Sequence, residues 1–218
     1  MVLNELISLL KTANSATQIN EKRDEIGDLI PAVKIMFDYD QQNHAHQFDL
    51  LTHSLNVVIN LPRNMEDDML YLAALFHDIG KPKSQCKGSR ADDTNMHYYG
   101  HPKKSAGIES PVIIPDLDQK GYKISCMDIK RLLYYEEYHD DHVSKKLKHI
   151  NRHMKMASFD EFRNLMFLQV ADAKAHVQLP IIAERVEVSS ALAGKEGESL
   201  YQMYLKQRMV NDGLIQMK

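Results

Sequence analysis

The sequence has few cysteines, few glycines and prolines, and no long hydrophobic run. Two cysteines, Cys86 and Cys126, are too few for a disulfide framework and are consistent with a reducing compartment. Nine glycines and seven prolines in 218 residues exclude a collagen-like or linker-rich chain. No apolar run approaches the roughly 18 residues of a membrane span, and the first residues lack the features of a signal peptide. These absences predict a soluble, cytoplasmic protein.

The sequence also lacks an excess of charge of one sign. Its 27 Lys and Arg residues against 30 Asp and Glu residues give a net charge of −3, so no global basic field attracts nucleic acid. The hydrophobic share of 44% and the charged share of 26% are ordinary for a globular protein and exclude wholesale disorder. We expect a single domain over residues 1–218. The glycine-rich phosphate loop, the Rossmann glycine pattern, the nucleophile elbow and the His-Glu-x-x-His motif are all missing.

Apolar residues recur at three- and four-residue spacings along most of the chain, which predicts helices and no convincing strand. We expect a short helical turn over 102–108 and about nine helices: 3–10, 21–36, 49–61, 64–80, 127–138, 143–153, 158–177, 180–188 and 199–210. Pro31 is expected to kink or break the second of them. Asn64 and Ser158 are predicted caps, the second with Glu161 at the capping-box position. Residues 82–100 and the segment around Gly194 and Gly197 are expected to be loops.

Histidine is unusually frequent, with 11 residues that all lie between His44 and His176. Imidazole is the commonest metal ligand, although a single histidine more often lies on the surface. The His77–Asp78 pair ends a predicted apolar helix, and the two side chains can reach one cation. His53 and Asp172 lie among apolar helical positions, where an unpaired polar or charged group is costly. Together these residues predict a divalent-metal site.

The order of these residues resembles that of the HD-domain superfamily of metal-dependent phosphohydrolases. The resemblance covers about residues 26–177 and is carried by the segments 42–53, 76–82, 100–101, 138–140 and 171–172. Within the superfamily, the chain is most similar to the HD region of bacterial tRNA nucleotidyltransferases. It lacks their nucleotidyltransferase head, because it is too short and has no Gly-Ser followed by an Asp-x-Asp strand. We therefore expect a free-standing HD protein.

The resemblance implies an all-α fold, an HD-domain helical bundle with inward-facing metal ligands and with N- and C-terminal helices packed on its core. The implied ligands are His53, His77, Asp78 and Asp172 for one metal ion, and Asp78, His101 and His139 for a second. One or two ions are expected, with Mn, Fe, Co, Ni, Zn or Mg as candidates. Such an ion lowers the pKa of a bound water towards neutrality, and Asp78 and Lys81 are the expected catalytic residues.

Basic residues close to these ligands are candidates for substrate binding, although a solvated surface is the commoner place for a lysine. Lys104 follows His101 by three residues, and Lys145 follows the segment of His139. His142 lies three residues after His139 on the same helical face, so it could contact substrate or carry a proton.

The spacing of one further carboxylate and of the remaining histidines predicts their environments. Asp49 lies four residues before His53 and could orient its imidazole. His44, His149, His153 and His176 are expected on the surface.

The chain departs from the family pattern after the Gly100–His101 step. Pro102 stands where similar proteins tend to have glutamate, and Pro111 and Pro115 interrupt the segment that follows. Residues 112–114 could be a short extended piece. We expect a local variation over 112–126, at the rim of the pocket.

Two functions of different classes fit this sequence. The first is a metal-dependent phosphohydrolase, a phosphomonoesterase or a 2′,3′-cyclic phosphodiesterase, whose partner is a phosphate-bearing small molecule such as a nucleotide, or an RNA end. The second is a non-catalytic, nucleotide-binding helical module with a structural metal. The complete set of metal ligands favours the enzyme.

Overall fold

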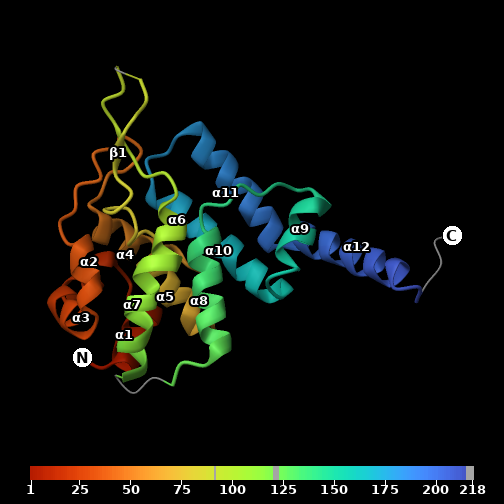
Figure 1. Cartoon of the computed structure of the whole chain (residues 1–218), viewed down its shortest axis with the longest axis horizontal. Coiled ribbons are helices and arrows are strands. Elements are labelled where there is room, and N and C mark those ends of the chain that lie inside the picture. Colours follow the sequence, from red (N-terminus) through yellow and green to blue (C-terminus); the bar gives the residue numbers. More distant parts are fainter. Residues whose placement is uncertain (91, 120–122, 215–218) are drawn as a thin grey trace.

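The described part of the chain is built almost entirely from helices (Figure 1). The computed structural model describes residues 1–90, 92–119 and 123–214. Within these ranges the α-helices are α1 (Leu3–Thr12), α2 (Ala16–Asn20), α3 (Arg23–Leu29), α4 (Leu50–Asn60), α5 (Asp68–Phe76), α6 (His101–Lys104), α7 (Ser110–Gln119), α8 (Cys126–Tyr138), α9 (Leu147–His153), α10 (Phe159–Ala175), α11 (Pro180–Ala193) and α12 (Lys195–Asn211). The predicted all-α class is confirmed.

The core lies between α4, α5, α8 and α10. Helix α10 packs against both α4 and α11, and α5 packs against α4 and α8. In α5 every residue from Met69 to Phe76 is buried, as expected for a helix that is apolar on all sides. Helices α1 to α3 cover one end of this core, while α12 extends away from it at the other (Figure 1). No described helix is long and apolar enough to span a membrane.

Several predicted helix boundaries agree with the structure. Helix α3 ends at Leu29, and a 3₁₀ segment from Pro31 to Met36 follows it, because proline in a helix interior removes a hydrogen bond. The side chain of Ser158 caps α10 by accepting a hydrogen bond from the backbone NH of Glu161, in the predicted capping box. Asn64 is not a cap. It has a positive φ of 62°, and Asp67 caps α5 instead by accepting from the NH of Met69.

Residues 112–114 are helical rather than extended. They lie in α7, which is preceded by a π-helical turn from Ser105 to Glu109. Ile113 and Leu117, one turn apart, are both buried, and this packing outweighs the cost of Pro115 on the exposed side of the helix. Within the predicted variation over 112–126, residues 120–122 fall outside the described residues.

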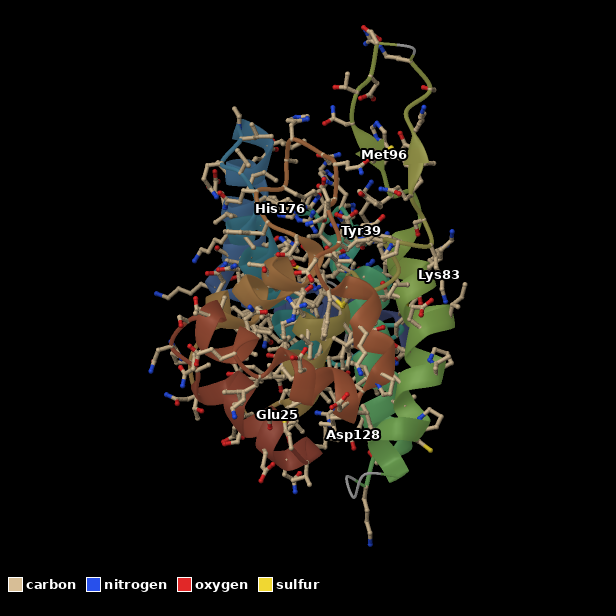
Figure 2. The ribbon with its side chains drawn as sticks, turned by 90° about the vertical axis from the view of Figure 1, so that its left-hand side faces the viewer. Glu25, Tyr39, Lys83, Met96, Asp128 and His176 are labelled. Atoms are coloured by element: carbon tan, nitrogen blue, oxygen red, sulfur yellow. The ribbon has the colours of Figure 1, made fainter. Side chains whose placement is uncertain are left out.

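Gly197 lies inside α12 rather than in a loop. A Cβ atom there would lie 1.8 Å from the carbonyl oxygen of Leu192, so only glycine permits this close approach of α11 and α12. A small hairpin in the predicted loop 82–100 pairs β1 (Cys86–Lys87) with β2 (Met96–His97), antiparallel. The hairpin, marked by Met96, projects beyond the helices (Figure 2).

Candidate metal centre

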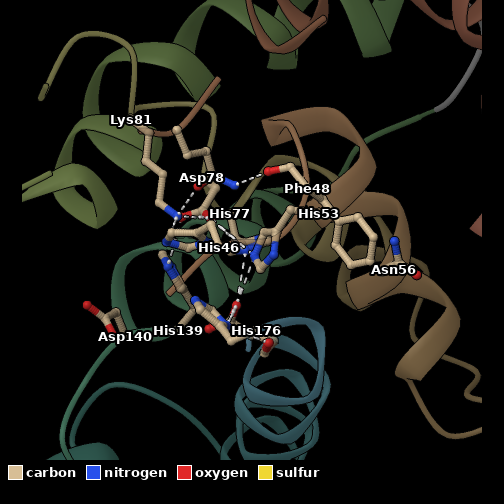
Figure 3. Close-up of polar contacts among 12 residues, drawn as sticks. His46, Phe48, His53, Asn56, His77, Asp78, Lys81, His139, Asp140 and His176 are labelled. Carbon is tan, nitrogen blue, oxygen red and sulfur yellow. Dashed lines mark hydrogen bonds and ion pairs between the residues drawn. The ribbon is translucent and has the colours of Figure 1, made fainter. Parts of the chain in front are cut away.

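Six imidazole and carboxylate side chains converge where several helices end. They are His53 in α4, His77 and Asp78 directly after α5, His101 in α6, His139 directly after α8, and Asp172 in α10. Each is at most 9% exposed. Figure 3 shows four of them, His53, His77, Asp78 and His139, close together. Segments up to 119 residues apart in the sequence thus meet at one point.

A glycine permits the approach of α6 to the end of α5. A Cβ atom on Gly80 would lie 2.6 Å from the backbone N of Ser105 and 2.7 Å from the carbonyl oxygen of His101. The backbone NH of Gly80 donates to the hydroxyl of Ser105 at 2.9 Å. Because α6 can come this close, Nε2 of His101 lies 3.0 Å from Oδ1 of Asp78.

Three of the histidines are held in the same way. Nδ1 of His77 lies 2.9 Å from the carbonyl oxygen of Ala74. Nδ1 of His101 lies 2.8 Å from that of Tyr98, and Nδ1 of His139 lies 2.7 Å from that of Glu136. A carbonyl oxygen can only accept, so each Nδ1 donates, and in the neutral imidazole this leaves the lone pair on Nε2. This arrangement fixes the tautomer and orientation that a metal-binding imidazole needs.

The two carboxylates lie between the imidazoles. Oδ1 of Asp172 lies 3.1 Å from Nε2 of His53 and 3.7 Å from Nε2 of His77. Oδ2 of Asp78 lies 3.4 and 3.3 Å from the same two nitrogens, and its Oδ1 lies 3.6 Å from Nε2 of His139. Asp78 therefore faces two groups of imidazoles, with one carboxylate oxygen towards each.

The electrostatics of the cluster favour a cation. Although burial opposes ionisation, Lys81 and the surrounding histidines hold the pKa of Asp78 well below its usual range, and His176, His53 and His77 do so for Asp172. Burial alone would lower the pKa of His77, yet the two carboxylates raise it to about 10. Without a metal ion, the negative charge of the two carboxylates therefore favours a proton on His77.

The residues present fit a divalent metal. Nε2 of His77 and Oδ1 of Asp78 are buried without a hydrogen-bond partner, and Nε2 of His101 faces Nε2 of His139 at 3.2 Å. Two lone pairs at that distance repel unless a cation or a proton lies between them. Two groups within this cluster have ligand atoms close enough for one ion, namely His53 with His77 and Asp172, and His77 with Asp78 and His139. Mixed imidazole and carboxylate ligands suit first-row transition metals.

A cavity of about 310 Å³ opens directly on this cluster, and basic side chains line it. Lys81 lies 2.7 Å from Oδ2 of Asp78 and also donates to Oε1 of Gln41 at 2.9 Å. His46 and His176 lie on the same wall with ring centroids 4.5 Å apart. Arg185 of α11 donates to the carbonyl oxygen of His139 at 2.6 Å. Lys81 and Arg185 supply positive charge to this lining, beside the carboxylates of Asp78, Asp140 and Asp172, and such cationic groups can bind a phosphate.

The described residues that line this cavity do not include the predicted substrate-binding residues Lys104, Lys145 and His142. Lys104 donates instead to the carbonyl oxygen of Lys83, and Lys145 pairs with Glu187 and Glu196 at 3.4 and 3.5 Å. His142 lines a neighbouring cavity. Closeness in sequence to a ligand did not predict these positions, because α6 and the segment after α8 turn those side chains away from the centre.

Other candidates also have different environments from those expected. Asp49 caps α4 through the NH of Thr52 and does not orient His53. His153 is fully buried, and its Nδ1 lies 2.8 Å from the hydroxyl of Tyr134. His176, also expected on the surface, lines the cavity, with Nδ1 3.5 Å from Oδ1 of Asp172.

Among the cavity residues that the sequence prediction missed, His176 had a signal in the sequence. His176 lies four residues after Asp172, which places it on the same helical face and could have identified it. Arg185 had no such signal, because its guanidinium reaches the site from α11, a helix that carries none of the expected ligands. Its place depends on how α11 packs against α10.

The HD domain family model matches residues 50–182 of this chain, which include all six clustered side chains. The chain belongs to the HD domain family. Members of this superfamily are metal-dependent phosphohydrolases that bind divalent metals. No curated protein and no solved structure matches the chain, so nothing in these comparisons supports the closer similarity to tRNA nucleotidyltransferases. The HD match begins after His46, so the histidine pair formed by His46 and His176 is only half inside it.

Proposed function

We propose that this HD domain protein hydrolyses a phosphate ester on a nucleotide or at a nucleic-acid end, as a phosphomonoesterase or a 2′,3′-cyclic phosphodiesterase. One observation carries the proposal: three buried histidines, each held through Nδ1 by a backbone carbonyl, direct Nε2 towards the carboxylates of Asp78 and Asp172 beside a cavity that also contains Lys81 and Arg185. A purely structural histidine cluster would not need an adjoining cavity with two cationic side chains in its wall.

The ligands proposed for a first divalent ion are His53, His77, Asp78 and Asp172, and those for a second are Asp78, His101 and His139. When bound, such an ion stabilises charge on the phosphoryl oxygens and acidifies water. Lys81, fixed by Asp78 and Gln41, and Arg185, fixed by the carbonyl of His139, would contact the non-bridging phosphoryl oxygens. In the reaction, water adds to phosphorus, and the ester oxygen leaves as an alcohol after taking up a proton.

The proposal is tested with purified protein, its metal content and a panel of phosphate esters. We expect the protein to contain a transition metal and, with added Mn²⁺ or Ni²⁺, to release phosphate from adenosine 5′-monophosphate or to open adenosine 2′,3′-cyclic monophosphate. A metal-loaded protein that turns over neither ester, yet melts at a higher temperature with the nucleotide, would instead be the non-catalytic binding module.

Lys81 provides a sharper test, because its two expected effects have opposite signs. Its ammonium group competes with a metal ion for Oδ2 of Asp78, at 2.7 Å. We expect Lys81→Gln to bind Mn²⁺ at least as tightly as the wild type while kcat/KM falls by about tenfold or more, as for the loss of a charge-assisted phosphate contact. Isothermal titration with Mn²⁺ and steady-state kinetics measure the two effects.

The matched control is Lys103→Gln, the loss of an exposed lysine in α6, which should change neither quantity. Weaker metal binding together with unchanged kcat/KM in Lys81→Gln would contradict the proposed role of Lys81.

A further inference from the structure

A basic surface lies on α9 and on the segments of chain directly before and after it. Residues 142–155 contain four lysines and an arginine but no aspartate or glutamate, in a chain whose net charge is −3. Lys148, Arg152 and Lys155 follow one another at spacings of four and three residues, which corresponds to one face of α9 and of the turn after it. Positive charge that the chain as a whole lacks is therefore concentrated here.

Part of this charge has no carboxylate partner. Lys145 pairs with carboxylates of α11 and α12, and Arg152 pairs with Asp141. The other three cations are exposed, and their ammonium groups make no ion pair or hydrogen bond with any described residue: Lys146, Lys148 and Lys155. These three side chains are available to an anionic partner.

A groove between α9 and α12 continues the basic surface. The two helices pack against each other (Figure 1), and a cavity of about 560 Å³ opens between them. Lys155 and Arg208 are its two cations, and none of the described residues that line it is acidic. The carboxylate of Asp212, which is exposed and outside the lining, lies 3.9 Å from Nη2 of Arg208. The groove therefore favours a negatively charged ligand.

The uncharged polar groups of the groove are three amides and a phenol, from Asn151, Tyr204, Gln207 and Asn211. Oδ1 of Asn151 is buried without a hydrogen-bond partner, while its Nδ2 donates to Oε1 of Gln207 at 3.4 Å. A ligand that donates a hydrogen bond would satisfy this oxygen. Tyr204 stacks on Tyr201 with ring centroids 6.0 Å apart, which fixes the plane of its ring.

We infer that this basic surface and its groove bind single-stranded nucleic acid. Proteins that bind single strands combine a basic groove, which follows the phosphodiester backbone, with aromatic rings on which bases stack. Lys148 and Lys155 contact the phosphates, Tyr204 stacks on a base, and a base amino group or a sugar hydroxyl donates to Asn151. The inference goes beyond the proposed hydrolase function and does not depend on it.

A membrane fits this surface less well. A helix that lies on a membrane needs an exposed apolar face beside its basic one. No large apolar side chain of residues 142–155 is exposed, and the exposed Met203 and Met209 of α12 do not line the groove. The lysines of the basic surface are therefore accompanied by amides and a tyrosine, which suit bases and sugars.

The inference is tested by fluorescence anisotropy with a labelled single-stranded RNA dodecamer and the DNA dodecamer of the same sequence. Neither strand has a terminal phosphate, so binding needs no turnover. We expect Lys148→Gln/Lys155→Gln to bind the strands about tenfold more weakly than the wild type at low salt. The plot of log association constant against log salt concentration should become shallower by about 1.4, because each phosphate contact with a single strand contributes about 0.7.

Two further variants separate charge from stacking. Lys123→Gln/Lys130→Gln removes the same charge from exposed positions before and within α8, and should bind as the wild type does. Tyr204→Leu keeps an apolar side chain but removes the ring. We expect it to bind about tenfold more weakly with an unchanged salt dependence, because stacking on a base involves no phosphate. Thermal melting shows that each variant is folded.

Strand binding that is accompanied by no hydrolysis of any phosphate ester would contradict the proposed function and leave this inference intact. A wild-type protein that binds neither strand would overturn the inference, as would a double variant Lys148→Gln/Lys155→Gln with unchanged affinity and salt dependence. Poly-glutamate, or vesicles of phosphatidylcholine and phosphatidylserine, that compete better than an unlabelled strand would also overturn it. The surface would then belong to an acidic protein or a membrane.

Discussion

Asp78→Asn will lose bound metal and reduce turnover by more than about 100-fold. The substitution keeps the shape of the side chain but removes the charge that faces both groups of imidazoles. Loss of groups that only support a metal ligand already costs about 10- to 100-fold, so loss of a carboxylate that bridges the groups should cost more. Metal analysis of the purified variant and phosphate release with added Mn²⁺ measure the two effects.

The stability of Asp78→Asn must be measured alongside its activity. Lys81 is 4% exposed and would lose its ion pair, and breaking a buried pair costs about 3–5 kcal/mol. Urea unfolding therefore separates misfolding from loss of the site. Asp24→Asn, at a carboxylate that is 92% exposed, is the matched control and should retain metal, activity and stability. Stoichiometric metal with full turnover in Asp78→Asn would refute the site assignment.

Glu136→Gln will remove a pH dependence of stability between about pH 5 and 8. Burial raises the pKa of Glu136 to about 8 from an ordinary value near 4.5, and the hydroxyl of Ser110 is its partner. In this range the folded state holds a proton on Glu136 that the unfolded chain lacks, so the free energy of unfolding falls as pH rises. At about 1.4 kcal/mol per pKa unit, the full effect is about 5 kcal/mol.

The measurement is the free energy of unfolding by urea at several pH values, for the wild type and for Glu136→Gln. Glutamine can keep the Ser110 contact but cannot ionise, so the variant should gain stability relative to the wild type as pH rises. Glu137→Gln, at the partly exposed neighbouring position of α8, is the control. A difference between wild type and Glu136→Gln that stays constant from pH 5 to 8 would show that Glu136 is not the source.

Local sequence patterns were sufficient for most of the helices. The apolar spacing in 158–177 and the Ser158–Glu161 box predicted α10 almost to its ends, because a cap and an apolar face act within one turn of the chain. Residues 112–114 were misread, because two prolines suggested a break while the burial of Ile113 and Leu117 decided for a helix. Packing against helices that are distant in the chain cannot be predicted from the local sequence pattern.

The candidate site, too, could be predicted only in part from the sequence. The sequence by itself identified the side chains proposed here as metal ligands, since His53, the His77–Asp78 pair and Asp172 stood at helical positions where an unpaired polar group is too costly to keep. Only the tertiary structure decided how they meet and what surrounds them. The contact at Gly80 brings α6 to Asp78, and the packing of α11 places Arg185 in the shared wall of two neighbouring cavities. Helical periodicity specifies which face a residue occupies, whereas the distance between two faces depends on the packing of the whole core.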